Sequence, residues 1–255
     1  MSKKCNLGLI IYEIRNLSGN LFVHFFGVIF PIVMSMIISS QATKEAPESM
    51  KQEVVTAIVI TMSLIIPMAI MLMGYAANYS NEIEKNVPLR MRLFGYNEKS
   101  IILAKLIAQL IFLTVAMAVY AVAEVILLDL QKPALLSLII LVVSLYLVAI
   151  IFFMLAHGVA NILKKFGPTY VVTMSLYFLF MMLCGMMGIQ SDQLPKPIKT
   201  IAFTLPMPHI SNEYIDFWQG QSYNFMPVIQ SFLFLGALAG IVLMFSFYKN
   251  RRKIA

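Results

Sequence analysis

The sequence of 255 residues is 60% apolar and only 12% charged, whereas a soluble domain is about half apolar and a quarter charged. This composition excludes an ordinary water-soluble domain. The net charge of +7 comes from short Lys and Arg clusters beside apolar runs, which is typical of membrane topology and contact with anionic lipid rather than of nucleic-acid binding. Cys5 and Cys184 lie far apart, so we expect no disulfide framework.

The first predicted element is a helix over Cys5–Ser18 that lies in the membrane interface. Its apolar residues fall near helical spacing and are Leu7, Ile10, Ile11, Ile14 and Leu17. The polar side is assigned to Lys3, Lys4, Glu13, Arg15 and Asn16. The alternative is a frayed basic N-terminus. The apolar run that begins near Leu21 is long enough to stay as a span, so no cleavable signal peptide is expected.

Six segments are long and apolar enough to cross about 30 Å of hydrocarbon as helices. They are Asn20–Ser39, Val54–Asn78, Ile101–Leu128, Ala134–Ala160, Pro168–Ile189 and Pro227–Tyr248. The apolar runs do not alternate as the strands of a membrane barrel do. The predicted fold class is therefore an all-α integral membrane protein with one transmembrane domain over residues 1–255.

Basic residues set the expected orientation of these spans. With the N-terminus inside, 14 of the 19 Lys and Arg residues fall on the inner side and 5 on the outer side. The positive-inside rule therefore predicts that both termini are cytoplasmic. The loop Tyr79–Ser100 and the turn Asn161–Gly167 are then cytoplasmic, and the segment Gln190–Met226 is external.

The cytoplasmic loop Tyr79–Ser100 exposes more apolar side chains than a simple connector needs. These are Val87, Leu89, Met91, Leu93 and Phe94, flanked by Arg90 and Arg92. We interpret them as a short helix that ends at Gly95, a residue that often stops helices, and that docks into another protein. The alternative is an interfacial helix that faces lipid.

The external segment Gln190–Met226 is rich in proline and aromatic residues. The prolines at and within it are Pro195, Pro197, Pro206, Pro208 and Pro227, and the aromatic residues include Tyr214, Phe217, Trp218 and Tyr223. We interpret it as a helical hairpin or broken helix that dips partly back into the outer leaflet, where its backbone must be covered by protein. The alternative is a surface loop with aromatic anchors.

No motif predicts catalysis or a bound cofactor. The sequence lacks the GxxxxGK[ST] pattern of a P-loop. His157 and Asn161 form an HxxxN pattern that some intramembrane metalloproteases use, but Glu124, the only intramembrane carboxylate expected, lies near the opposite end of the third span. We expect no metal site, because the three histidines lie at different depths. The 19 methionines favour adaptable packing over transport of a soft metal.

Glu124 is the residue within a span that most needs an explanation, since an ionisable group there usually faces protein or a water-filled cavity. It is a candidate for a translocation path or a subunit interface, together with Tyr120, which lies one helical turn before it on the same face. The alternative is that Glu124 reaches the outer interface.

The layout resembles the membrane subunit (permease) of type-2 ATP-binding-cassette exporters. The resemblance rests on the amphipathic N-terminal segment, the loop EIEKNVPLRMRLFGYNEKSIILAK, the segment LPKPIKTIAFTLPMPHISNEYIDFWQG and the basic tail after the last span. In the loop, the matching residues are Glu82, Glu84, Arg90–Phe94, Gly95, Glu98–Ser100 and Lys105. In the external re-entrant segment, they are Pro195, Pro206, Pro208, Tyr214 and Gly220.

The resemblance implies that two such permease subunits, identical or related, pair in a bacterial cell membrane above two copies of a cytosolic ATPase. ATP and Mg²⁺ would be bound by that ATPase and not by this chain. The ATPase-coupling residues implied are Glu82, Glu84, Arg90, Arg92, Leu93, Phe94 and Gly95, with Lys164 and Lys165 as a lesser contact. The permease itself would carry out no catalysis.

The cargo is less well defined by the sequence. The Phe-, Met- and Leu-rich spans suit an apolar or amphipathic compound, and we favour an amphipathic peptide, as in the exporters of cytolytic or antimicrobial peptides. One alternative is a membrane protein that transports nothing, such as an immunity or assembly factor. The other is an intramembrane protease.

Overall fold

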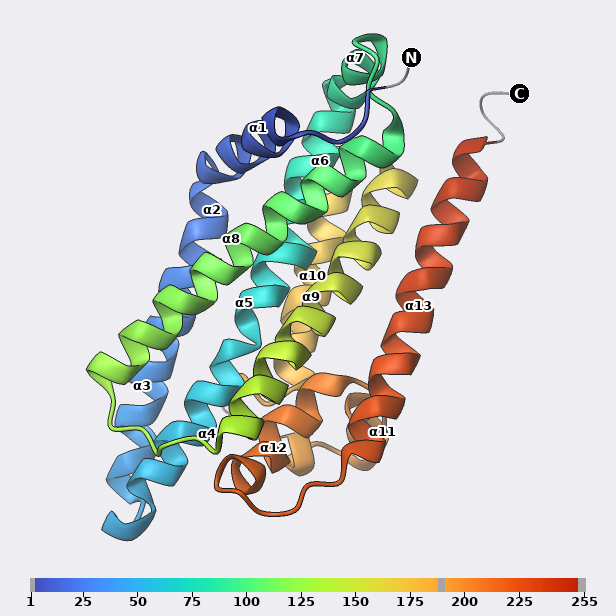
Figure 1. Cartoon of the computed structure of the whole chain (residues 1–255). Coiled ribbons are helices and arrows are strands. Elements are labelled where there is room, and N and C mark those ends of the chain that lie inside the picture. The colour runs from blue at the N-terminus through green and yellow to red at the C-terminus, as the bar shows by residue number, and fades with distance from the viewer. Residues whose placement is uncertain (1–2, 188–190, 252–255) are drawn as a thin grey trace.

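The computed structural model describes residues 3–187 and 191–251 (Figure 1). The described residues form helices joined by short turns, and their only β pairing is an isolated parallel bridge between Lys3 and Tyr96. Within the described residues, six helical segments are long and apolar enough to cross a membrane. They are Leu21–Lys44, Glu48–Glu84, Glu98–Leu127, Leu135–Leu163, Phe166–Leu183 and Phe225–Asn250. The predicted all-α fold with six spans is confirmed.

The first span follows helix α1 (Leu7–Ser18) and consists of α2 (Leu21–His24), the π-helical turn η1 (Phe25–Ile29) and α3 (Phe30–Glu45). The side-chain oxygen of Asn6 accepts a hydrogen bond from the backbone N–H of Leu9 and so caps α1. Figure 1 shows α1 turned across one end of the bundle before the chain enters the first span.

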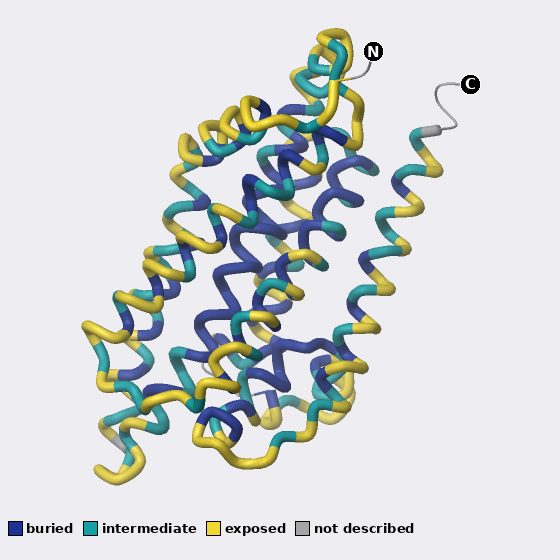
Figure 2. The backbone as a smooth tube through the Cα atoms, viewed as in Figure 1, coloured by how far each residue is buried: buried dark blue, intermediate teal, exposed yellow. Residues whose placement is uncertain are grey.

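The second span is the central helix of the bundle. It runs through η2 (Glu48–Met50), α4 (Lys51–Ser63), α5 (Ile65–Pro67), the π-helical segment η3 (Met68–Gly74) and α6 (Tyr75–Glu84). Its residues 60–77 are all buried, as the dark blue tube in Figure 2 shows. At Gly74, an added Cβ would lie only 2.5 Å from Cγ2 of Val23, so the absence of a side chain lets the first and second spans approach closely.

The short helix α7 (Val87–Leu93) leads from the second span to the third, α8 (Glu98–Leu127). The fourth, fifth and sixth spans are α9 (Leu135–Leu163), α10 (Phe166–Leu183) and α13 (Phe225–Arg251). Helix α13 packs mainly along α9. A Cβ at Gly158 of α9 would lie 2.9 Å from Cγ1 of Val242, so this pair of helices is also closely packed.

The far end of the bundle holds η4 (Ser191–Gln193), α11 (Lys196–Ala202) and α12 (Pro206–Trp218) (Figure 1). Pro206 stands in the first turn of α12, where its missing N–H is not needed. Helix α12 packs against α4, α9 and α13, and Pro206, Pro208, Tyr214 and Trp218 are buried. The segment is thus two helices separated by a break. Residues 188–190 of the predicted external segment lie outside the described residues.

Candidate functional site

Helix α7 stands at the end of the bundle that also holds α1 and the last turns of α13 (Figure 1). Its start follows Asn86, which adopts a left-handed backbone (φ +55°), with Pro88 in the first turn. Gly95 follows its end with φ +93°, a conformation that glycine adopts at little cost. The exposed fraction is 80% for Leu93 and 72% for Phe94. Large apolar side chains are therefore presented at the tip of the molecule.

A groove of about 460 Å³ separates α7 from α1. Its lining includes Leu9, Tyr12, Val87, Arg90, Met91 and Phe94. The N–H of Lys3 donates a hydrogen bond to the carbonyl of Gly95 at 2.8 Å, so the chain before α1 is fastened to the residue that follows α7. The two helices together make one surface with an apolar floor.

Arg90 and Arg92 are exposed on this surface and have only weak partners among the residues that the structure describes. Nη2 of Arg90 lies 3.4 Å from the carbonyl oxygen of Lys85, and Nη1 of Arg92 lies 3.9 Å from Oε2 of Glu98. Exposed contacts of this length contribute little to stability. Both guanidinium groups are therefore available to a partner.

Glu82 and Glu84 belong to the end of the second span, because α6 continues through Glu84 instead of ending near Asn78 as the sequence indicated. Oε2 of Glu84 accepts a hydrogen bond of 2.8 Å from the N–H of Phe166, the first residue of α10. A carboxylate at a helix N-terminus is favourable for the helix dipole. Glu84 thus joins the second span to the fifth.

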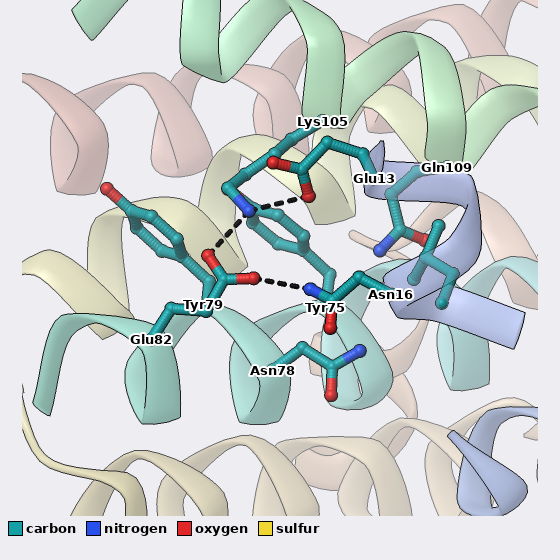
Figure 3. A pocket seen from close by; sticks show the side chains of 9 residues that line it. Glu13, Asn16, Tyr75, Asn78, Tyr79, Glu82, Lys105 and Gln109 are labelled. Atoms are coloured by element: carbon teal, nitrogen blue, oxygen red, sulfur yellow. Dashed lines mark hydrogen bonds and ion pairs between the residues drawn. The ribbon is translucent and has the colours of Figure 1, made fainter. Parts of the chain in front are cut away.

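Glu82 takes part in a buried ion cluster with Lys105 and Glu13 (Figure 3). Nζ of Lys105 lies 2.6 Å from Oε2 of Glu82 and 2.8 Å from Oε2 of Glu13. Nδ2 of Asn16 donates to the other oxygen of Glu82 at 2.6 Å. These side chains come from α1, α6 and α8, so the cluster ties the N-terminal helix to the second and third spans.

The cluster holds two carboxyl groups against one ammonium group, and all three side chains are at least nine-tenths buried. Burial raises the pKa of the Glu13 carboxyl above its ordinary value, although Lys105 opposes that rise. The cavity among these residues is only about 10 Å³. Because the groups are tightly enclosed, each depends on the others for compensation of its charge.

The remaining predicted coupling residues lie between the fourth and fifth spans. Helix α9 extends to Leu163, so the turn between the spans is shorter than the predicted Asn161–Gly167. Lys164 adopts a left-handed backbone (φ +58°), and its N–H donates to the carbonyl of Ala160. Lys165 is exposed at the start of α10. Both residues lie at the same end of the bundle as Glu84, which contacts Phe166.

Glu124 is fully buried within the chain instead of reaching the surface. Its Oε1 accepts a hydrogen bond from the hydroxyl of Ser35 in the first span. Tyr120 lies on the same face of α8, and its hydroxyl donates to the carbonyl of Val59 in the second span at 2.8 Å. The two predicted residues therefore lie where the first three spans meet.

In the external segment, the hydroxyl of Tyr214 donates to the carbonyl of Ser137 in α9 at 2.6 Å.

His157 and Asn161, the residues of the HxxxN pattern, contact tyrosines of the second span. Nδ1 of His157 is hydrogen-bonded to the hydroxyl of Tyr75 at 2.7 Å, and the hydroxyl of Tyr79 donates to Oδ1 of Asn161 at 3.4 Å. Within residues 3–187 and 191–251, no group of three His, Cys, Asp or Glu side chains is placed to hold a metal ion. The contacts of His157 and Asn161 therefore hold the fourth span against the second.

The partnership of Glu13 with Lys105 was missed by the sequence analysis, which placed Glu13 on the polar side of the first helix. The available signal was Lys105 itself. A lysine four residues into a predicted span requires a counter-charge, and Glu13 and Glu82 are the carboxylates that the fold brings to it.

The chain was compared with known protein families and with curated proteins. The family described as ABC-2 type transporter matches residues 7–212, which include α1, α7, the ion cluster and the first half of α12. No curated protein matches the chain.

Proposed function

The chain belongs to the ABC-2 type transporter family, whose members are membrane permease subunits of ABC exporters, and we propose that two permease subunits form a translocation path driven by a separate ATPase. The family normally pairs with a cytosolic ATP-binding-cassette ATPase. Here that ATPase binds the surface formed by α7 and α1. The observation that carries the proposal is the outward-facing apolar tip of α7, with Leu93 80% exposed.

The chemistry of the α7 surface suits a protein cleft. Leu93 and Phe94 supply apolar area, and burying it in a partner contributes roughly 25 cal/mol for each Å² removed from water. Arg90 and Arg92 flank this area and are positioned to pair with carboxylates of the ATPase. Buried aromatic and arginine side chains are the usual anchors of protein interfaces.

The ion cluster supplies a route by which movement of α7 reaches the spans. The chain joins α7 directly to α6 and α8, and Lys105 holds both helices to α1 through Glu82 and Glu13. These segments therefore move as one unit when the ATPase closes on ATP. For work to be done, nucleotide must favour one arrangement of the spans over the other.

The end of the bundle that holds α7 is the cytoplasmic end in this proposal. It carries the basic residues Lys85, Arg90, Arg92, Lys99, Lys164, Lys165 and Lys249, as the positive-inside rule requires. Both termini are then cytoplasmic and α12 is external. In a bacterial cell membrane, this arrangement places the docking surface where ATP is made.

The cargo is an amphipathic peptide or another apolar compound. This part of the proposal is supported by the Phe-, Met- and Leu-rich composition of the spans. The second permease subunit is identical or homologous.

Purification from native membranes tests the proposal. The wild-type chain should bring with it a P-loop ATPase, identified by mass spectrometry, in a complex of two permease subunits and two ATPase subunits. In liposomes, the complex should hydrolyse ATP faster when cargo is present. Leu93→Asp should lower recovery of the ATPase at least about tenfold, because a charge would have to be buried in the interface.

Met50→Asp is the matched control, since Met50 is also exposed but lies at the opposite end of the bundle. Its effect on ATPase recovery should be negligible. If the wild-type chain brings no ATPase, or Leu93→Asp and Met50→Asp retain it equally, α7 is not the docking helix.

A further inference from the structure

A groove of about 700 Å³ opens on the flank of the bundle between α4, α8 and α9. The groove is mostly apolar and is lined by Ile60, Ile66, Met117, Leu141 and Leu145, among others. The segment 128–133 and Trp218 of α12 also line it, and Figure 1 shows this segment crossing from the end of α8 to the start of α9. Its volume lies in the range of small-molecule sites.

The groove faces the surroundings of the bundle. Val125 of α8 and Leu138 of α9 line it and are 69% and 39% exposed. Side chains at this position on a spanning helix meet lipid. A molecule that enters here comes from the bilayer and must itself carry an apolar part.

Glu124 lines this groove and has an unused hydrogen-bonding atom. Its Oε1 accepts from Ser35, whereas Oε2 is buried and has no hydrogen-bond partner within the described residues. The hydroxyl of Tyr120 lies beside this carboxyl group and also donates to the carbonyl of Val59 at 2.8 Å. A buried carboxyl oxygen without a partner is costly, and a cation in the groove would supply the missing partner.

Other charged groups in the lining are few. Asp129 and Lys132 lie in the segment at the end of the groove, and Asp129 accepts a hydrogen bond from Gln52 at 2.7 Å. Two carboxyl groups therefore face the groove against one exposed ammonium group. This balance favours a ligand with positive charge at the end near Glu124.

We propose that the groove between α4, α8 and α9 binds a single-chain amphiphile with a primary ammonium group, the alkyl chain lying among the apolar side chains and the ammonium group paired with Glu124. The ligand reaches the groove laterally from the bilayer. The groove and Glu124 would bind such a ligand whether or not α7 binds an ATPase.

Trp218 provides a direct readout, because it is the only tryptophan of the chain and it lines the groove. The protein is placed in phosphatidylcholine nanodiscs and titrated with a primary alkylamine that carries a nitroxide quencher on its chain. The alcohol and the carboxylic acid with the same labelled chain are titrated in parallel. The amine should quench Trp218 saturably, with a half-saturation concentration at least about tenfold below that of the other two.

Two variants locate the site. Glu124→Gln should raise the half-saturation concentration of the amine to that of the alcohol and leave the alcohol unchanged, whereas Glu48→Gln, on the exposed turn η2, should change neither. Ala121→Phe, which keeps the carboxyl group and fills the groove from an exposed position, should abolish saturable quenching. This second variant keeps the test decisive if Glu124→Gln does not fold.

Three results would overturn the proposal. The first is equal half-saturation for the amine, alcohol and acid. The second is an amine titration unaffected by Glu124→Gln or by Ala121→Phe. The third is a marked loss of amine binding in nanodiscs that contain phosphatidylethanolamine, which would assign the site to the amino head group of a bilayer lipid.

Discussion

Nζ of Lys105 in α8 lies 2.8 Å from Oε2 of Glu13 in α1, although the two residues are 92 positions apart in the sequence. The pair is almost fully buried. It fixes α1, which precedes the first span, to the beginning of the third span. Because Glu82 shares the same ammonium group, the contact is one part of a cluster whose members cannot be changed independently.

Lys105→Met should destabilise the protein by about 3–5 kcal/mol, because it leaves two buried carboxyl groups without a cation. Thermal unfolding in detergent, followed by circular dichroism, measures the loss. Lys99→Met, at an exposed position on the same helix, should leave the unfolding temperature nearly unchanged. Equal unfolding temperatures for the two variants would show that Lys105 does not hold the cluster together.

Glu13→Gln should destabilise the protein less than Lys105→Met does, and it should change the pH dependence of stability. Since the folded pKa of Glu13 is raised above 4.5, the folded protein binds more protons than the unfolded chain just above that pH. Its stability therefore falls as pH rises from 4.5 through the raised pKa. Glu13→Gln should lose this decline, and unfolding temperatures measured across the window test it. The decline should persist in the exposed-site variant Glu48→Gln. If it also persists in Glu13→Gln, Glu13 is not the group whose raised pKa causes the decline.

Gly74→Ala should destabilise the protein by about 1–3 kcal/mol, the usual cost of overpacking. The new Cβ would lie 2.5 Å from Cγ2 of Val23 and 3.0 Å from the carbonyl oxygen of Ala69. Adding Val23→Ala should recover part of the loss by removing the nearest atom. Gly240→Ala is the control, because nothing lies within 4 Å of a Cβ there. The same unfolding temperature for Gly74→Ala and Gly240→Ala would contradict the close approach of the first two spans.

Arg90→Glu and Arg92→Glu should each weaken the association with the proposed ATPase while leaving unfolding within about 0.5 kcal/mol of the wild type, since both side chains are exposed. The effect on association follows from placing a like charge opposite the carboxylates of the partner. Recovery of the ATPase in the purification described above measures it. Lys132→Glu, at the opposite end of the bundle, should have no effect. Unchanged recovery in both arginine variants would remove these residues from the docking surface.

The sequence predicted the spans because each needs about 20 apolar residues, a property that is local in the chain. It placed the end of the second span too early, at Asn78 rather than Glu84. The polar residues of α6 there gain buried partners that are distant in sequence, such as Lys105 for Glu82. The π-helical segments η1 and η3 were not predicted, since their residues are ordinary apolar ones.

The candidate site was predicted unevenly for the same reason. The helix before Gly95 followed from local signals, and it appears as α7. Glu13 looked like a surface residue because its spacing fits the polar side of an amphipathic helix, and only the third span, folded against α1, reveals its partner. Likewise, the burial of Glu124 depends on Ser35 of a different span.

The hydrogen bond from Lys3 to Gly95 has a practical consequence for handling the protein. An affinity tag or fluorescent fusion attached before Lys3 would begin next to α7 and block the binding of a partner to its exposed end. Attached beyond Arg251, the same tag would extend from α13, whose end stands apart from α7 (Figure 1). Purification handles therefore belong at the C-terminal side, and a failure to capture a partner through an N-terminal handle would carry little weight.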